Sequence, residues 1–83
     1  MKINVKYFAS IREAMGQGSE LLETQAATLA ELRDALIARG GAGGDALARG
    51  RAVRLALNQV MSDESVVLTE GCEVAFFPPV TGG

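Results

Sequence analysis

A short apolar strand that runs directly into two prolines, near the end of the sequence, constrains the fold most strongly. The residues from Val74 to Phe77 are all apolar, and Pro78 and Pro79 follow them. Proline fixes φ and has no backbone N–H to donate to a neighbouring strand, so the sheet has to end at Pro78. We therefore expect a folded body of residues 1–79 and an extended tail of residues 80–83.

The tail ends on Gly82 and Gly83. At up to about 3.5 Å per extended residue, the tail spans roughly 14 Å, and it carries the terminal carboxylate away from the body. Because glycine has no Cβ, such an end can enter a narrow channel and adopt dihedral angles that are closed to other residues. We predict that the chain presents the carboxylate of Gly83 to other proteins.

The composition indicates one small globular domain that is not a self-contained catalyst. The chain has 83 residues, 48% of them hydrophobic, and a net charge of -2, so it lacks the basic footprint of nucleic-acid binding. With no histidine and a single cysteine, it lacks the residues of His-based triads and of the usual zinc sites. No apolar run approaches the ~20 residues that span a membrane. We expect a cytoplasmic protein that binds no metal, membrane or nucleic acid.

The first third of the sequence predicts two strands joined by a short helix. Apolar and polar residues alternate over residues 2–8, which predicts a half-buried strand with Ile3, Val5 and Tyr7 on one face. Ser10 and Glu13 have the spacing of a capping box, and Gly16 suits the end of a helix of one or two turns. Residues 19–24 then predict an edge strand.

One strong helix is predicted in the middle of the chain. Thr28 and Glu31 form a second capping-box pair. Apolar residues recur after it at i, i+3, i+7 and i+8, and these are Leu29, Leu32, Leu36 and Ile37. The glycine-rich segment 40–44 ends the helix, and it lacks the lysine and hydroxyl residue of a phosphate-binding loop. We interpret it as a loop without a chemical role, followed by a short helical turn that begins at Asp45.

Three further strands complete the pattern. Residues 52–58 alternate, Asn58-Gln59 predicts a tight turn into a short strand at 60–61, and residues 74–77 form the last strand. This order favours an α+β fold in which one main helix packs across a mixed sheet of about five strands. A β-grasp arrangement is the simplest solution, with the first and last strands side by side in the middle.

The four aromatic residues occur as two adjacent pairs, Tyr7-Phe8 and Phe76-Phe77. Neighbouring residues on a strand point to opposite faces of the sheet. If Tyr7 and Phe76 join the core, then Phe8 and Phe77 emerge together on the other face, beside the root of the tail. Exposed contiguous apolar surface often marks a partner site, and aromatic rings are favoured anchors there.

Residues 71–83, Gly-Cys-Glu-Val-Ala-Phe-Phe-Pro-Pro-Val-Thr-Gly-Gly, closely resemble the C-terminus of the small subunits of molybdopterin synthase. Residues 5–13 and 57–59 resemble the same family, so the resemblance spans the chain. It implies a ubiquitin-like β-grasp fold and a non-catalytic role as the sulfur carrier of a sulfurtransferase complex. The resemblance also implies a heterotetramer with two large subunits, which carry the catalytic residues.

The resemblance implies a particular chemistry for Gly83. A partner adenylyltransferase, similar to ubiquitin-activating enzymes, adenylates the terminal glycine with ATP, and sulfur from a donor protein then displaces AMP. The resulting thiocarboxylate makes Gly83 a 1-thioglycine, which donates sulfur to cyclic pyranopterin monophosphate in the large subunit. The carrier itself binds no cofactor. Two sulfurs are needed for the dithiolene of each product.

Other residues take their implied roles from the same resemblance. The residues expected to thread into the partner are Pro78, Pro79, Val80, Thr81 and Gly82. Those expected at the partner interface are Phe8, Arg12 and Phe77. Cys72 stands where the family more often has an acidic or polar residue, and we interpret it as a tolerated turn position.

Three alternatives remain open from the sequence. The sulfur carrier of thiazole synthesis shares the fold and the tail but serves another acceptor, and the Phe-Phe-Pro-Pro-Val-Thr segment argues against it. A ubiquitin-like protein modifier would end in an isopeptide bond to a lysine of its target. A plain ubiquitin-like interaction module would not need Gly83 at all.

Overall fold

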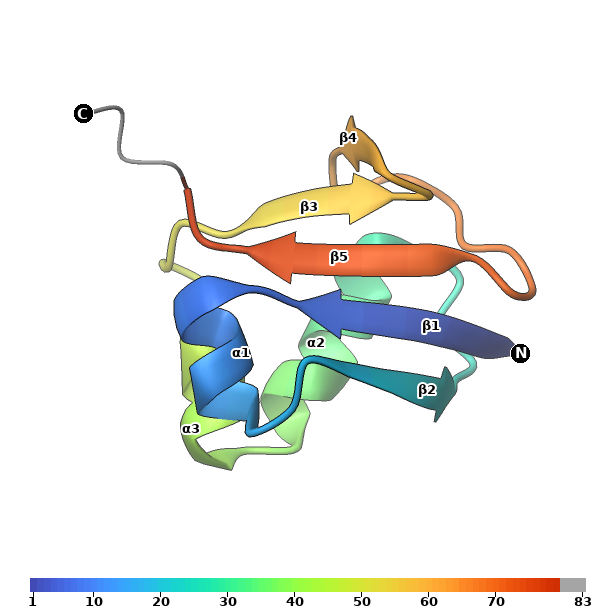
Figure 1. Cartoon of the computed structure of the whole chain (residues 1–83). Coiled ribbons are helices and arrows are strands. Elements are labelled where there is room, and N and C mark those ends of the chain that lie inside the picture. Colours follow the sequence, from blue (N-terminus) through green and yellow to red (C-terminus); the bar gives the residue numbers. More distant parts are fainter. Residues whose placement is uncertain (80–83) are drawn as a thin grey trace.

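Five strands and three helices form two layers in the computed structural model, which describes residues 1–79 (Figure 1). The strands are β1 (Lys2–Tyr7), β2 (Ser19–Glu23), β3 (Arg54–Leu57), β4 (Val60–Ser62) and β5 (Glu73–Phe77). The helices are α1 (Ala9–Met15), α2 (Leu29–Ala38) and α3 (Gly41–Ala46). The helices lie on one face of the sheet, and we call the other face the open face (Figure 1). None of the described helices is long and apolar enough to cross a membrane.

The sheet has the strand order β2-β1-β5-β3-β4, which confirms the predicted β-grasp arrangement. β1 and β5 are parallel neighbours, with Tyr7 opposite Phe76, and the other strand pairs are antiparallel. The core lies between the sheet and the helices, where the predicted apolar residues of β1, β5 and α2 are buried. They include Ile3, Val5, Tyr7, Leu29, Leu32, Leu36, Val74 and Phe76.

Helix α2 begins as its capping box predicts. The Oγ1 atom of Thr28 accepts a hydrogen bond from the backbone N–H of Glu31, at 3.3 Å. The carboxylate of Glu31 reaches back to the N–H of Ala27, at 2.8 Å, one residue earlier than in the usual motif. One unpaired N–H of the first helical turn and the N–H of the residue before the cap are therefore satisfied by the two predicted side chains.

The predicted capping box of α1 is wrong. The helix begins at Ala9, with Phe8 in the capping position and no side chain bonded there. The backbone of Phe8 explains the difference, because its N–H donates to the carbonyl of Phe76 and its own carbonyl accepts from Ile11 and Arg12. Phe8 therefore belongs both to the last hydrogen bond between β1 and β5 and to the first turn of α1. Gly16, at φ 78°, ends the helix as expected.

The glycine-rich segment 40–44 is not a loop, because most of it forms α3. The glycines allow close packing of this helix against its neighbours. A Cβ at Gly43 would lie 2.6 Å from Sδ of Met15 in α1, and one at Gly44 would lie 2.7 Å from the carbonyl oxygen of Ile37 in α2. The expected start of a helical turn at Asp45 is therefore also wrong, since α3 begins four residues earlier.

Two other turn predictions have different outcomes. Asn58 and Gln59 form the tight turn between β3 and β4, with positive φ values of 50° and 69°. Asn58 also exchanges backbone and side-chain hydrogen bonds with Glu73 at the start of β5. Cys72, by contrast, is not a free turn position, because its side chain is 3% exposed and belongs to the core.

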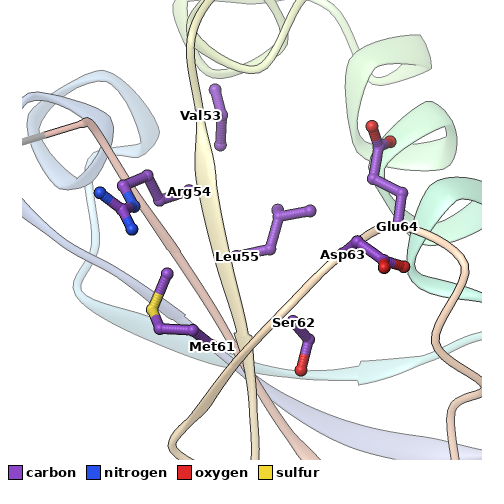
Figure 2. Close-up of a pocket in the computed structure, with 7 residues that line it drawn as sticks. All are labelled: Val53, Arg54, Leu55, Met61, Ser62, Asp63 and Glu64. Atoms are coloured by element: carbon purple, nitrogen blue, oxygen red, sulfur yellow. The ribbon is translucent and has the colours of Figure 1, made fainter.

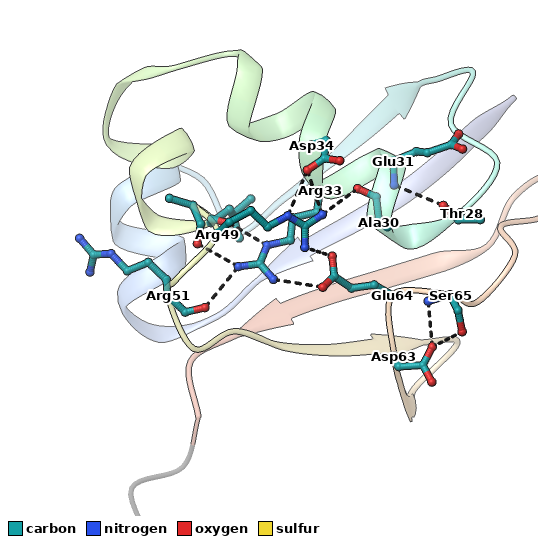
Figure 3. A network of polar contacts seen from close by, with 12 residues as sticks. Thr28, Ala30, Glu31, Arg33, Asp34, Arg49, Arg51, Asp63, Glu64 and Ser65 are labelled. Atoms are coloured by element: carbon teal, nitrogen blue, oxygen red, sulfur yellow. Dashed lines mark hydrogen bonds and ion pairs between the residues drawn. The ribbon is translucent and has the colours of Figure 1, made fainter.

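A network of polar contacts attaches α2 to the chain between α3 and β3 (Figure 3). The buried guanidinium of Arg33 donates to the carbonyl oxygens of Leu47, Ala48 and Arg51, at 2.7, 3.0 and 3.3 Å. It also pairs with the carboxylate of Glu64, at 3.6 Å. Burial lowers the pKa of Arg33, while the charge of Glu64 opposes this change. These contacts hold the segment that leads into β3.

Candidate functional site

Phe8 and Phe77 lie together on the open face, and we call them the aromatic patch. Their ring centroids are 6.1 Å apart and their planes meet at 85°, an edge-to-face contact. The side chain of Phe8 is 46% exposed and that of Phe77 is half-buried. The predicted patch is thus present at the end of β5, where the sheet stops.

The position of the patch depends on the second aromatic pair, on the opposite face of the same two strands. Tyr7 and Phe76 are 1% and 0% exposed, and their rings stack at 6.2 Å with an interplanar angle of 15°. The Tyr7 hydroxyl donates to Glu20, at 2.6 Å, and Glu20 in turn pairs with Arg39 at the end of α2. Burial and the bond to Glu20 raise the pKa of Tyr7 far above its usual value, so the phenol remains protonated.

Small and flexible apolar side chains extend the patch across the sheet. Ala75 lies opposite Ala56, and Ala56 lies opposite Met61, so the three share the open face. The alanines are almost inaccessible, whereas Met61 is 49% exposed. Met61 was missed in the sequence analysis, although the two-residue turn at 58–59 and the alternation of strand faces were sufficient to place it opposite Ala56.

The root of the tail follows directly on the patch. Phe77 is the last residue of β5, Pro78 is half-buried and Pro79 is exposed. Pro78 borders a shallow hollow between α1 and α3, whose floor includes Ile11 and Ala46. The predicted tail residues Val80, Thr81, Gly82 and Gly83 lie outside the described residues.

Arg12 lies at the same end of the molecule but on the far side of Phe8. Its backbone N–H donates to the carbonyl of Phe8, which places it one turn into α1. Its exposed side chain runs along Gly18, where a Cβ would be 3.2 Å from Nε of Arg12. Gly18 accepts the N–H of Tyr7 on the β2 side of β1, so Arg12 flanks the patch on the side away from Phe77.

The described residues offer no metal centre. No group of three or more histidine, cysteine, aspartate or glutamate side chains within residues 1–79 is arranged to hold a metal ion. The polar groups near the patch are the exposed Arg12 and Arg54 and the ion pair between Lys6 and Glu73, at 3.3 Å. The exposed rings and the cations beside them suit this part of the surface to binding another protein.

The sheet order and the helices packed on one face define a ubiquitin-like β-grasp protein. The chain belongs to the ThiS family, whose sequence model matches residues 5–83. The match begins in β1 and continues through the last glycine of the sequence.

Two relatives that are similar in sequence carry the same name. A protein of Haemophilus influenzae named "Molybdopterin synthase sulfur carrier subunit" is 38% identical over 81 residues, covering 98% of this chain and 99% of that protein. A protein of Mycobacterium tuberculosis with the same name is 39% identical over 85 residues, covering 100% of this chain and 99% of that protein. Among solved structures, a chain of the complex of subunits 1 and 2 of molybdopterin-converting factor from Helicobacter pylori has a TM-score of 0.70 at 26% identity, with both chains fully covered.

Proposed function

We propose that this chain is the sulfur-carrier subunit of a molybdopterin synthase and that Gly83 carries the sulfur as a thiocarboxylate. The observation that carries the proposal is similarity over nearly the whole chain to sulfur-carrier subunits, within a family match that extends to residue 83. The aromatic patch at the root of the tail supports it, because a carrier needs a surface that positions its tail in a partner.

Activation of Gly83 requires a partner enzyme. A free carboxylate is a poor acceptor for sulfur, since its leaving group would be oxide. An adenylyltransferase uses ATP to join the carboxylate to AMP and releases pyrophosphate, which converts the leaving group to AMP. Sulfide then displaces AMP and leaves the thiocarboxylate, with release of one proton. In this proposal ATP belongs to the partner, and the carrier binds no cofactor of its own.

Transfer of the sulfur takes place in the large subunit of the synthase. The tail enters its active site and the thiocarboxylate donates sulfur to cyclic pyranopterin monophosphate. Acid–base groups and substrate-binding residues belong to that subunit, which is consistent with a carrier sequence that contains no histidine. Each dithiolene needs two sulfurs, so two carriers are used for each product. We place these steps in the cytoplasm, where ATP is available to the activating enzyme.

The described residues have a positioning role in this scheme. Phe8, Phe77 and Met61 provide apolar anchors on one face, and the two prolines that follow Phe77 restrict the directions in which the tail leaves the sheet. We propose that these anchors hold the body at a fixed distance from the partner's active site. This fixed distance places the reactive carbon of Gly83 next to the substrate in the partner's active site. Correct placement matters because even small misplacements of a reacting group can lower rates about 100-fold.

Intact mass of the chain, purified from cells that contain its own adenylyltransferase, tests the proposal. We expect a species heavier by one oxygen-to-sulfur exchange, located in the C-terminal peptide. Unmodified protein, even after incubation with ATP, the adenylyltransferase and a sulfide source, would overturn it. Adducts joined to lysine through Gly83 would instead identify a protein modifier.

A variant with one additional glycine after Gly83 provides a sharper functional test. The body should unfold at the same denaturant concentration as the wild type, because residues 1–79 are unchanged. Molybdopterin formation in a reconstituted assay should fall at least about 100-fold, since the reactive carbon is displaced by one residue. Wild-type activity of this variant would contradict the positioning role of the tail.

A further inference from the structure

The arginines of the described chain differ in whether they have a carboxylate partner. Arg33, Arg39 and Arg49 each form an ion pair with a glutamate or aspartate, and they attach helix α2 to neighbouring segments. Within residues 1–79, Arg12, Arg51 and Arg54 have no carboxylate oxygen within 4.0 Å, and the one of these that belongs to a strand of the sheet is the exposed Arg54. The positive charge of Arg54 is therefore not neutralised by an ion pair within residues 1–79.

Arg54 stands beside the aromatic patch. It is the first residue of β3 and lies directly opposite Phe77 in the register with β5. Residues that are directly opposite on neighbouring strands share a face of the sheet, so Arg54 is on the open face. Figure 2 shows Arg54 and Met61 on one side of β3, with Leu55 and Glu64 on the other. The two acidic side chains that follow β4 are engaged elsewhere: Asp63 accepts hydrogen bonds from Ser65, and Glu64 pairs with Arg33 and Arg49.

Covering the patch would remove water from this arginine. A partner that buries Phe77 and Met61 also covers Arg54, which lies between their strands. Burying an unpaired guanidinium is unfavourable unless a carboxylate or equivalent acceptor replaces the lost water. No carboxylate oxygen of residues 1–79 lies within 4.0 Å of Arg54, and we therefore assign the acceptor to the partner. Arginine is also among the residues enriched in interface cores, because its planar group binds carboxylates in two-point contacts.

We propose that Arg54 extends the docking surface onto β3 and binds a carboxylate on the large subunit of the synthase. This inference rests on the proposed function, and it specifies the chemistry of the partner surface. The partner presents apolar side chains to Phe8, Phe77 and Met61, with an aspartate or glutamate at the β3 edge of this contact. The occupant is the large subunit because its contact is continuous with the surface that positions the tail for sulfur transfer.

Affinity measurements with a charge-reversed chain test the proposal. The full chain and its Arg54→Glu and Arg54→Gln variants are titrated into the large subunit from the same source by isothermal calorimetry, at low and at high salt. Lys2→Glu is the matched control, because it makes the same change in net charge at the opposite end of β1, away from the patch. Thermal unfolding of each variant verifies that it is folded.

We expect Arg54→Glu to weaken binding at least about tenfold. Arg54→Gln should weaken binding by a smaller factor, and its affinity should depend less on salt. Lys2→Glu should change the affinity less than about twofold.

Wild-type affinity of a folded Arg54→Glu variant would overturn the inference while leaving the proposed function intact. An equal loss in Lys2→Glu would also overturn it, because the effect would then be general charge attraction. Failure of the wild-type chain to bind the large subunit would overturn the proposed function itself.

Discussion

The two aromatic pairs of this chain occupy the same two strands and have opposite roles. Tyr7 and Phe76 stack in the core, whereas their sequence neighbours Phe8 and Phe77 meet edge to face on the open face. The side chains differ little in size or polarity, so residue type does not explain the difference. The face of the strand does, because each residue points opposite to the one before it. One pair therefore lies in the core, and the other lies on the face that we propose binds the large subunit.

Replacing Phe76 with alanine should have the largest effect on stability. Phe76 is completely buried, so the change removes a ring and leaves a cavity beside Tyr7. We expect the free energy of unfolding to fall by about 3–5 kcal/mol, which is a large part of the stability of a small domain. Urea denaturation measures the change. A loss below about 1 kcal/mol would mean that the core closes around the cavity.

The matched substitution Phe77→Ala should separate the two roles. Phe77 is half-buried and lies at the end of its strand, so we expect the free energy of unfolding to fall by no more than about 1 kcal/mol. Binding to the large subunit should weaken by about 2 kcal/mol, roughly 30-fold, as expected for an aromatic anchor. Calorimetric titration and urea denaturation of the same sample give both values. A stability loss equal to that of Phe76→Ala would remove the distinction between the faces.

Tyr7→Phe tests the polar end of the buried pair and should have a smaller effect. The ring and its stacking on Phe76 remain, and only the hydrogen bond from the hydroxyl to Glu20 is lost. Glu20 keeps its ion pair with Arg39, so no buried charge is left alone. We expect a decrease of about 1 kcal/mol in the free energy of unfolding. No change in affinity for the large subunit should accompany it, because Tyr7 is on the helix-covered face.

The pH dependence of the tyrosine absorbance reports the burial of the Tyr7 hydroxyl together with its bond to Glu20. Tyr7 is the only tyrosine and the chain has no tryptophan, so phenolate absorbance reports this residue alone. Because folding raises its pKa, the hydroxyl stabilises the fold below the unfolded value of about 10, and this contribution is lost as the pH rises toward the folded value. We expect no phenolate signal in the folded chain at pH values near 10. Ionisation there without unfolding would show that the hydroxyl of Tyr7 is not buried against Glu20 in solution.

Local patterns were sufficient to predict most elements of this fold. The alternation in residues 2–8, the capping pair Thr28 and Glu31, and the turn at 58–59 each depend on neighbours close in sequence, and the structure confirms them. The start of α1 was not predictable in this way. Phe8 ends a strand pairing with β5 and begins the helix, and its partner Phe76 is distant in the chain.

Two further differences have the same cause. Gly43 and Gly44 predict a loop in the sequence because a helix interior disfavours glycine. In the structure they lie in α3, where Met15 and the backbone of Ile37 leave no room for a Cβ. Cys72 follows a turn in sequence, yet its side chain points into the core. In each case a tertiary contact outweighs the local preference.

The sequence alone determined which residues share a face and where the sheet ends. Alternation separates Phe8 and Phe77 from the core, and Pro78 cannot continue the strand ladder, because both effects act within a few bonds. Only the tertiary structure decided what surrounds this patch. Arg54 and Met61 become its neighbours because β3 lies between β5 and β4, and that order follows from packing the whole sheet against the helices.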